Sequence, residues 1–359
     1  MKKRLIALLL LVAALLVLLA SCEVADGIGN AGTATGTRAE TAGENVADAG
    51  TGADETGSGT TLSVPGQTTA ATTKAGTPAS TKATTAATTR ATTAATTAKP
   101  DPGYEIPQMQ SAVKEPKAGD DPMKLSGIEN VMRIAWVLQH AEKYSVDGTG
   151  TVKASGTTQN VKVYKDYNCG VMLEIDITTS SMVNSATQFC YVGNTAMMRD
   201  ASGSKDSWNG RKTAWKTSAT KYSQPDDYWQ TYGLFGCELT NYLLNESTVT
   251  EWSAVTKNSD GTYTQTIKPN LSTSTTYYVK RMKTMGGLSG EPSFSKAEIT
   301  LTFNKDWRIL SMKIDETYKA KKKVLITVDA TCTASSTYTF TYGKADMSAY
   351  DNFFAAKIK

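Results

Sequence analysis

Apolar residues recur with a helical period where the chain first becomes rich in large side chains. This stripe advances in steps of three and four and comprises Ile128, Val131, Met132, Ala135 and Leu138. Such spacing predicts an amphipathic helix. Ser126 precedes Glu129 by three positions, which has the form of a capping box. We therefore expect a helix that begins after Ser126 and ends near Tyr144.

The next stretch alternates between apolar and polar residues, which predicts strands. The predicted strands are Val146–Ala154, Val161–Tyr167, Val171–Thr178 and Thr187–Met198. Turn-forming residues separate them, as in an antiparallel meander. The polar stretch Asp200–Gln224 then interrupts the pattern, although it carries Trp208, Trp215 and Tyr222.

A second helical stripe follows Pro225. Asp226 and Asp227 suit the positive end of a helix. The stripe comprises Tyr228, Tyr232, Phe235, Leu239 and Tyr242. Gly233 and Gly236 fall inside it and weaken the helix by about 1 kcal/mol each relative to alanine.

The remainder of the chain again favours strands. Val249–Lys257 and Thr262–Lys268 flank Ser259-Asp260-Gly261, which predicts a hairpin turn. Ser272–Met285 is predicted as a third helix, closed by Gly286 and Gly287. The last predicted strands are Ala297–Phe303, Arg308–Tyr318, Val324–Ala334 and Thr337–Tyr342. The element order predicts an α+β domain that is mainly antiparallel β.

The N-terminus has the layout of a secretory signal. Basic residues at 2–4 precede an uncharged apolar run from Leu5 to Ala20. Leu19-Ala20-Ser21-Cys22 resembles the lipobox of bacterial lipoproteins. The resemblance implies cleavage after residue 21 and a diacylglycerol on Cys22, with an N-linked acyl chain such as palmitate as a further possibility. It places the chain on the extracytoplasmic face of the cell membrane, held by its lipid anchor, whereas an uncleaved signal anchor is the alternative.

Residues 22–107 are rich in Gly, Ala and Thr and poor in large apolar residues. We expect a disordered linker there, because such a segment buries too little apolar surface to order. Its length of about 85 residues gives a root-mean-square span of roughly 50 Å. Residues 108–359 form the predicted folded domain. Threonine-rich composition is also compatible with glycosylation of the linker.

Charge gives no reason to expect nucleic acid as a partner. The chain has 38 Lys+Arg and 34 Asp+Glu, and three of the basic residues lie in the predicted signal. The mature chain would be nearly neutral, without the basic excess typical of nucleic-acid binding. We expect a monomer. Four cysteines remain besides Cys22, at Cys169, Cys190, Cys237 and Cys332, and they leave two disulfides or buried thiols open.

The segment EITLTFNKDWRILSMKIDETYKAK, a strand, an Asn-Lys-Asp turn and a longer strand, resembles the LolA/LppX-type lipoprotein carriers. The resemblance extends over about Leu125–Tyr342 as a pattern of elements. It implies a curved, half-open, β-barrel-like sheet whose concave face is covered by helices. In such carriers the apolar cavity between sheet and helices holds acyl chains.

The two helical stripes supply the candidate residues for such a cavity. The candidates are Met132, Ala135, Leu138, Tyr228, Tyr232, Phe235 and Leu239. The alternative is that these residues fill a dry core, which is the more frequent role of apolar stripes at helical spacing.

Catalytic chemistry finds little support. The single histidine, His140, lies in the first predicted helix without a nucleophile motif nearby. Glu174 and Asp176 share one face of a strand, and we interpret them as solvated carboxylates on the outside of the sheet. No metal-ligand spacing or cofactor-binding loop occurs. We therefore expect no enzyme, no metal and no cofactor.

Two functions remain. The first is a membrane-anchored carrier or sensor that binds a lipid or another amphipathic small molecule. The second is an interaction module on a stalk that binds a polysaccharide, a peptide or an envelope protein through Trp208, Trp215, Tyr222 and Trp229.

Overall fold

The computed structural model describes residues 102–180, 184–200, 208–209, 212–213, 220–222, 225–284, 286, 288–323, 327–351 and 355. The predicted signal, Cys22 and almost all of the predicted linker lie outside these residues. Within the described part, no helix is both long and apolar enough to cross a membrane. Tyr104 and Pro107 already contact the folded domain, since the Tyr104 hydroxyl donates to the carbonyl of Ala141 and Pro107 accepts from Gln139.

The first long helix, α2 (Gly127–Gln139), follows the short 3-10 helix η1 (Pro122–Lys124). The capping box is confirmed, because the Ser126 hydroxyl accepts from the Glu129 backbone N–H while the Glu129 carboxylate accepts from that of Ser126. The predicted end near Tyr144 is wrong. Tyr144 instead pairs with Tyr167 and Tyr342 on either side, so sheet hydrogen bonds replace the helical ones.

The predicted meander is present, with one strand divided. Its strands are β1 (Lys143–Ala154), β2 (Thr157–Asn168), β3 (Val171–Thr179), β4 (Asn184–Val192) and β5 (Ala196–Asp200). The single strand predicted over Thr187–Met198 is wrong. Gly193 adopts φ +50°, which turns the chain back so that β5 pairs with β4. The polar stretch beyond contains β6 (Trp208–Asn209), β7 (Lys212–Thr213) and β8 (Thr220–Tyr222).

The second helix, α3 (Pro225–Tyr232), is much shorter than its apolar stripe. Gly233 ends it with φ +67°, and a side chain there would collide with the carbonyl of Tyr277. Phe235, Leu239 and Tyr242 therefore lie in an irregular segment, and their predicted helical placement is wrong. The side chains still reach the interior, because the segment packs against the sheet.

The C-terminal half contains two further helices, α4 (Leu271–Ser274) and α5 (Thr276–Thr284), where one was predicted. Its strands are β9 (Val249–Trp252), β10 (Thr256–Lys257), β11 (Tyr263–Pro269), β12 (Ser293–Phe303), β13 (Ile309–Lys323) and β14 (Thr327–Tyr342). The hairpin turn at Gly261 is confirmed by its φ of +84°. The two last predicted strands are one, β14, because its pairing with β13 continues through Ser335 and Ser336.

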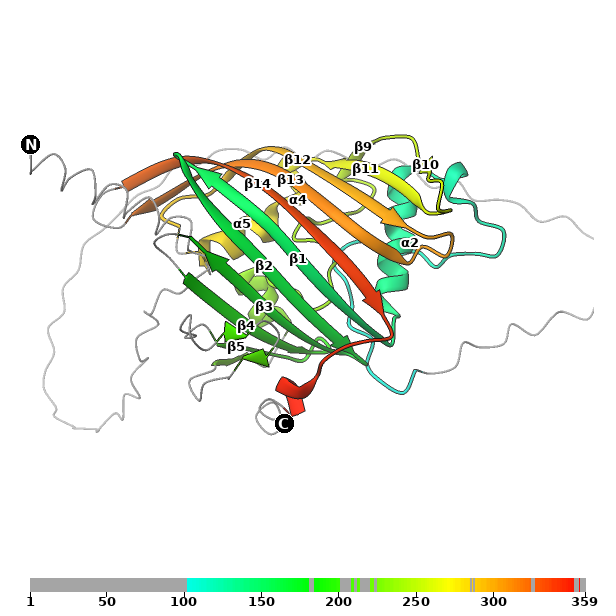
Figure 1. Ribbon diagram of the computed structural model, residues 1–359, viewed down its shortest axis with the longest axis horizontal. Helices are drawn as coiled ribbons and strands as arrows, with labels where there is room; N and C mark the ends of the chain where they lie inside the picture. Colours follow the sequence, from blue (N-terminus) through cyan, green and yellow to red (C-terminus); the bar gives the residue numbers. More distant parts are fainter. Residues whose placement is uncertain are drawn as a thin grey trace, which may run out of the picture. The chain divides into compact units, whose positions relative to one another are not determined.

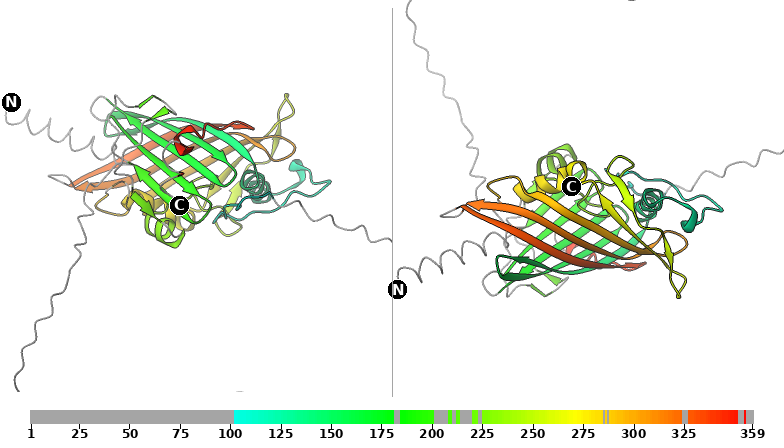
Figure 2. Two further views of the ribbon diagram at one scale, coloured as in Figure 1. Left: turned by 90° about the horizontal axis from the view of Figure 1, so that it is seen from below. Right: turned by 90° about the horizontal axis from the view of Figure 1, so that it is seen from above.

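These strands form an open, mostly antiparallel sheet with few helices. The strands of this sheet follow the order β10-β11-β12-β13-β14-β1-β2-β3-β4-β5-β8, and β9 also pairs with β11, whereas β6 and β7 pair with each other in a separate two-stranded sheet. The first and last strands of the folded part are therefore neighbours in the middle of the sheet (Figure 1). Figure 2 shows the green strands β1–β5 in front of the orange strands β12–β14 from one side and behind them from the other.

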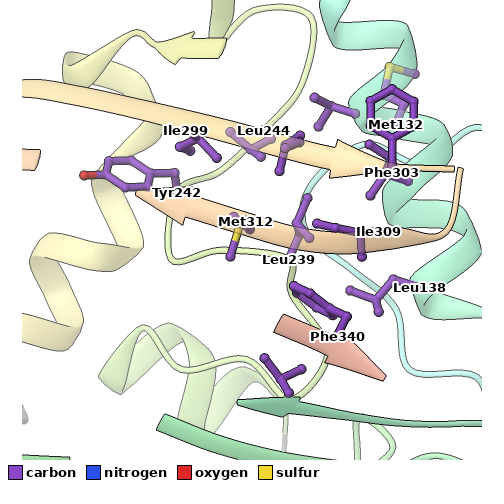
Figure 3. Close-up of a cluster of buried hydrophobic side chains, with 14 of the residues drawn as sticks. Met132, Leu138, Leu239, Tyr242, Leu244, Ile299, Phe303, Ile309, Met312 and Phe340 are labelled. Atoms are coloured by element: carbon purple, nitrogen blue, oxygen red, sulfur yellow. The ribbon is translucent and has the colours of Figure 1, made fainter. Parts of the chain in front are cut away.

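The main core lies between α2, the segment after α3 and strands β12–β14. Figure 3 shows Met132 and Leu138 of α2 beside Phe303, Ile309 and Phe340 of the sheet. Phe303 and Ile309 are fully buried. All four described cysteines are free thiols, so the disulfide alternative fails for this part of the chain.

Candidate ligand-binding cavity

A cavity of about 200 Å³ lies inside the folded domain. Strands β1, β2, β3, β13 and β14 line it together with residues of α2, α5 and the segment 235–242. Successive side chains of a strand point to opposite faces. Val161 and Val163 of β2 therefore face the cavity, whereas Lys162 between them is exposed.

Much of the cavity wall is apolar, yet several of its side chains are not fully packed. Val152, Val161, Val163 and Ile314 remain half-buried on this inner face. Elsewhere in a protein interior, such side chains would be in close contact on all sides. The partial exposure means that the wall is open to a small molecule.

Two glycines shape the wall at the middle of β1. Gly148 pairs with Tyr338 of β14 and with Val163 of β2. A methyl group at Gly148 would come within 2.7 Å of the Tyr338 ring, and one at Gly150 would collide with Ser336. The missing side chains let the Tyr338 ring lie across β1. Glycines inside a strand signal such a close approach.

A cluster of charges crosses from the sheet to α5. Arg281 of α5 lies 2.7 Å from Asp176 and 3.5 Å from Glu174, and Lys165 of β2 lies 3.5 Å from Glu174. Arg281 also donates to the side-chain oxygen of Asn241 at 3.0 Å. All four charged side chains line the cavity. The interpretation of Glu174 and Asp176 as solvated is therefore wrong, because Glu174 is only 2% exposed.

The two carboxyl groups differ in their electrostatic surroundings. Burial raises the pKa of Asp176 to about 7, helped by the neighbouring Glu174 charge and opposed by Arg281 and Lys165. Burial also acts to raise the pKa of Glu174, but Lys165 and Arg281 outweigh it and leave that pKa below its usual value. Glu174 is thus the ionised partner of the two cations, and Asp176 takes up a proton near neutral pH.

This difference gives a testable dependence of stability on pH. Between about pH 4 and about pH 7 the folded chain holds a proton on Asp176 that the unfolded chain has released, so this group lowers the unfolding free energy as pH rises. Asp176→Asn should remove a contribution of up to about 1.4 kcal/mol per pH unit in that range. Urea unfolding at about pH 5, 6 and 7 measures it.

The control is Asp315→Asn, a carboxylate on the outer face whose pKa stays below its usual value: burial raises it, but Lys313 and Ser335 outweigh that effect. Asp315 therefore contributes to the unfolding free energy throughout this pH range, and that contribution is lost only in more acidic solution. Equal slopes for Asp176→Asn and the unchanged chain would contradict the prediction.

A third carboxyl group, Glu316 of β13, lies among tyrosines. It accepts hydrogen bonds from the Tyr242 hydroxyl at 2.5 Å and from the Tyr278 hydroxyl at 2.8 Å. Burial raises its pKa, and the two hydroxyl groups lower it by less. Glu238 is the fourth carboxyl group in the cavity wall, and its side chain accepts hydrogen bonds from the backbone N–H groups of Gln110 and Ser111.

The candidate residues from the sequence divide between the cavity and its surroundings. Leu138, Phe235 and Leu239 line the cavity. Met132 and Ala135 are buried on α2 away from it, and Tyr228 is buried beside Tyr191, with 6.2 Å between ring centroids. Tyr232 is half-buried at the core edge. Most of the wall comes from strand residues, which helical stripes could not identify.

Of the residues predicted for surface recognition, Trp229 is the one whose side chain lies within the described part of the chain. The side chains of Trp208 and Tyr222, and all of Trp215, lie outside the described residues. Trp229 is half-buried and packs against Phe235 and Tyr277, with ring centroids 5.9 and 5.4 Å away. His140 stacks on Trp136 at 4.2 Å. The described residues contain no group of three or more His, Cys, Asp or Glu that could hold a metal.

No protein-family model matches the chain, and no curated protein matches it in sequence. A DUF1329 family protein from Desulfovibrio piger ATCC 29098 is similar in structure, with 13% identity over 66% of this chain and 99% of that chain and a TM-score of 0.27. A putative outer membrane lipoprotein-sorting protein domain from Vibrio parahaemolyticus is similar at 9% identity, over 64% of this chain and 97% of that chain, with a TM-score of 0.24. Scores this low do not establish a shared fold. The resemblance to LolA/LppX-type carriers therefore stays a prediction.

Proposed function

We propose that this chain binds an apolar or amphipathic small molecule in the cavity between its sheet and α2, α5 and the segment 235–242. The observation that carries the proposal is the half-buried apolar wall of Val152, Val161, Val163 and Ile314 around about 200 Å³ of space. Ligand sites in proteins are concave and mostly apolar, with a few polar groups that orient the ligand.

Polar groups with unmet hydrogen bonds support the same proposal. Gln159 of β2 is fully buried, lines the cavity, and has no hydrogen-bond partner among the described residues for either of its amide atoms. Buried polar groups are nearly always paired. A ligand with a polar end would offer the missing partner.

We further propose that the chain acts by binding and not by catalysis, and that a lipid on Cys22 holds it at the extracytoplasmic face of the cell membrane. The support is the lipobox-like Leu19-Ala20-Ser21-Cys22 after an apolar run. Two acyl chains suffice for stable attachment. Metabolic labelling with a palmitate analogue tests this, because Cys22→Ser should remove the label and release the chain from membranes.

Binding is tested by filling the cavity. Val161 is half-buried, and its neighbours across the sheet are Gly150 and Thr178, so Val161→Trp should place its ring in the empty space. We expect native mass spectrometry of the full chain to find a small molecule bound to the unchanged protein and none on Val161→Trp.

Lys162→Trp is the matched control, because it adds the same ring to the exposed face of the same strand. It should bind as the unchanged chain does. An unchanged chain that neither retains nor takes up any apolar compound would refute the proposed function.

A further inference from the structure

Glu316 is a buried carboxyl group without a cationic partner among the described residues. It is 7% exposed and lines the cavity, and the contacts of its two oxygens are with the hydroxyl groups of Tyr242 and Tyr278. Its neighbour Asp315 faces the other side of β13, where Lys313 lies 2.7 Å away. The outer carboxylate, Asp315, thus has a cationic partner, whereas the described partners of the inner one, Glu316, are neutral groups.

The surroundings of Glu316 are aromatic. Tyr242 and Tyr278 meet at 82° with 5.4 Å between ring centroids, and Phe294 lies 5.1 Å from Tyr278 and 5.2 Å from Tyr318. Aromatic faces attract organic cations, and several rings around one point form the usual binding site of a quaternary ammonium group. A carboxylate among such rings adds a full negative charge.

The charge balance of the cavity wall is negative and also favours a cationic ligand. Besides Asp176, which takes up a proton near neutral pH, three carboxyl groups line the cavity, namely Glu174, Glu238 and Glu316, against the two cations Lys165 and Arg281. Both cations lie within 3.5 Å of Glu174. The positive charge in the wall is therefore concentrated at β3, whereas the hydrogen-bond partners of Glu316 on β13 within the described part of the chain are tyrosine hydroxyl groups.

Each Glu316 oxygen still has room for another hydrogen bond. A carboxylate has about four lone-pair sites, and the two tyrosines occupy two of them. Isolated charges are costly in a protein interior unless an opposite charge accompanies them. A ligand cation at this point would supply that charge.

We infer that the cavity takes an amphipathic molecule with an organic cation, such as an ammonium group, and that the cation pairs with Glu316 between Tyr242 and Tyr278. The inference rests on the proposed function, since it names the polar end of the ligand in the same cavity. The apolar part of the molecule lies along Val161, Val163 and Ile314. Anionic amphiphiles such as fatty acids meet a carboxylate at that position and are disfavoured.

The test compares three soluble probes of equal chain length, namely octyltrimethylammonium, octanoate and neutral octyl glucoside. Equilibrium dialysis against vesicles of a neutral glycolipid without an ammonium group, such as digalactosyldiacylglycerol, with and without the full chain separates binding by the protein from uptake by the lipid. The cationic probe should bind at least about tenfold more tightly than octanoate, and Glu316→Gln should weaken it by about tenfold while octyl glucoside is unaffected.

Asp315→Asn is the matched control, because it removes the same charge from the outer face of the same strand, and it should leave all three affinities unchanged. Unchanged octyl glucoside binding shows that Glu316→Gln is folded. Tyr278→Leu provides a second variant and should weaken the cationic probe alone.

A preference for octanoate, or equal binding of cation and anion, would overturn the inference while the proposed function stands. The same holds if Glu316→Gln binds the cation as well as the unchanged chain does. Absence of binding by all three probes would count against the proposed function itself.

Discussion

Replacing Arg281 by methionine should lower the unfolding free energy by about 3–5 kcal/mol near pH 8, which is the usual cost of removing one partner of a buried ion pair. Among the described residues, Glu174 and Asp176 would keep Lys165 as their cationic neighbour, and the Arg281 side chain that holds them is 14% exposed. The loss should be smaller near pH 5, because Asp176 is then protonated. Urea unfolding at both pH values measures the difference.

Arg281 also connects α5 to the sheet. No residue of α5 is fully buried, so polar contacts such as Arg281 with Asp176 and Tyr278 with Glu316 hold the helix in place. We therefore expect faster amide hydrogen exchange in α5 of the Arg281→Met variant. Lys283→Met on the same helix is the control, because its pair with Glu291 is exposed and such pairs contribute at most about 1 kcal/mol. Similar results for the two variants would show that the buried cluster has no special role.

Phe303→Ala should also destabilise the fold by about 3–5 kcal/mol, the typical cost of a large cavity in a core. Phe303 is fully buried on β12 and stacks on Tyr263 with 5.9 Å between ring centroids. Figure 3 places it beside Met132 of α2, outside the set of residues that line the ligand cavity. The measurement is urea unfolding combined with probe binding under native conditions.

The expected result is a large loss of stability with unchanged affinity for octyl glucoside, because Phe303 itself does not line the cavity. Lys305→Ala, an exposed change in the turn that follows β12, should alter stability by less than about 0.5 kcal/mol. Loss of probe binding in a folded Phe303→Ala protein would show that the two regions are coupled.

Local patterns were sufficient for most of the elements. The capping box at Ser126 and Glu129 formed as predicted, because both partners lie within one turn of helix. The alternation in β1, β2 and β3 predicted strands that are present. The Asp260-Gly261 turn was predictable for the same reason, since the conformational freedom of glycine acts on its own position.

The patterns failed where distant residues decided the outcome. Tyr144 continues the helical spacing of α2, but pairing with Tyr167 and Tyr342 makes it a strand residue. The stripe from Tyr228 to Tyr242 is broken at Gly233, where the carbonyl of Tyr277 leaves no room for a side chain. None of these three distant neighbours can be identified from the local sequence.

By itself, the sequence predicted an export signal with a lipobox-like end, and it determined the compositional boundary near residue 107 and the mainly antiparallel character of the domain, because these follow from composition and from spacing within a few residues. Only the tertiary structure decided which carboxylates are buried. Strand alternation puts Glu174 and Asp176 on one face, but the face becomes a cavity wall only when Arg281, more than a hundred residues later, reaches them. The same holds for Glu316, whose partners Tyr242 and Tyr278 come from outside the sheet. Burial depends on contacts between distant parts of the chain, and periodicity carries no information about them.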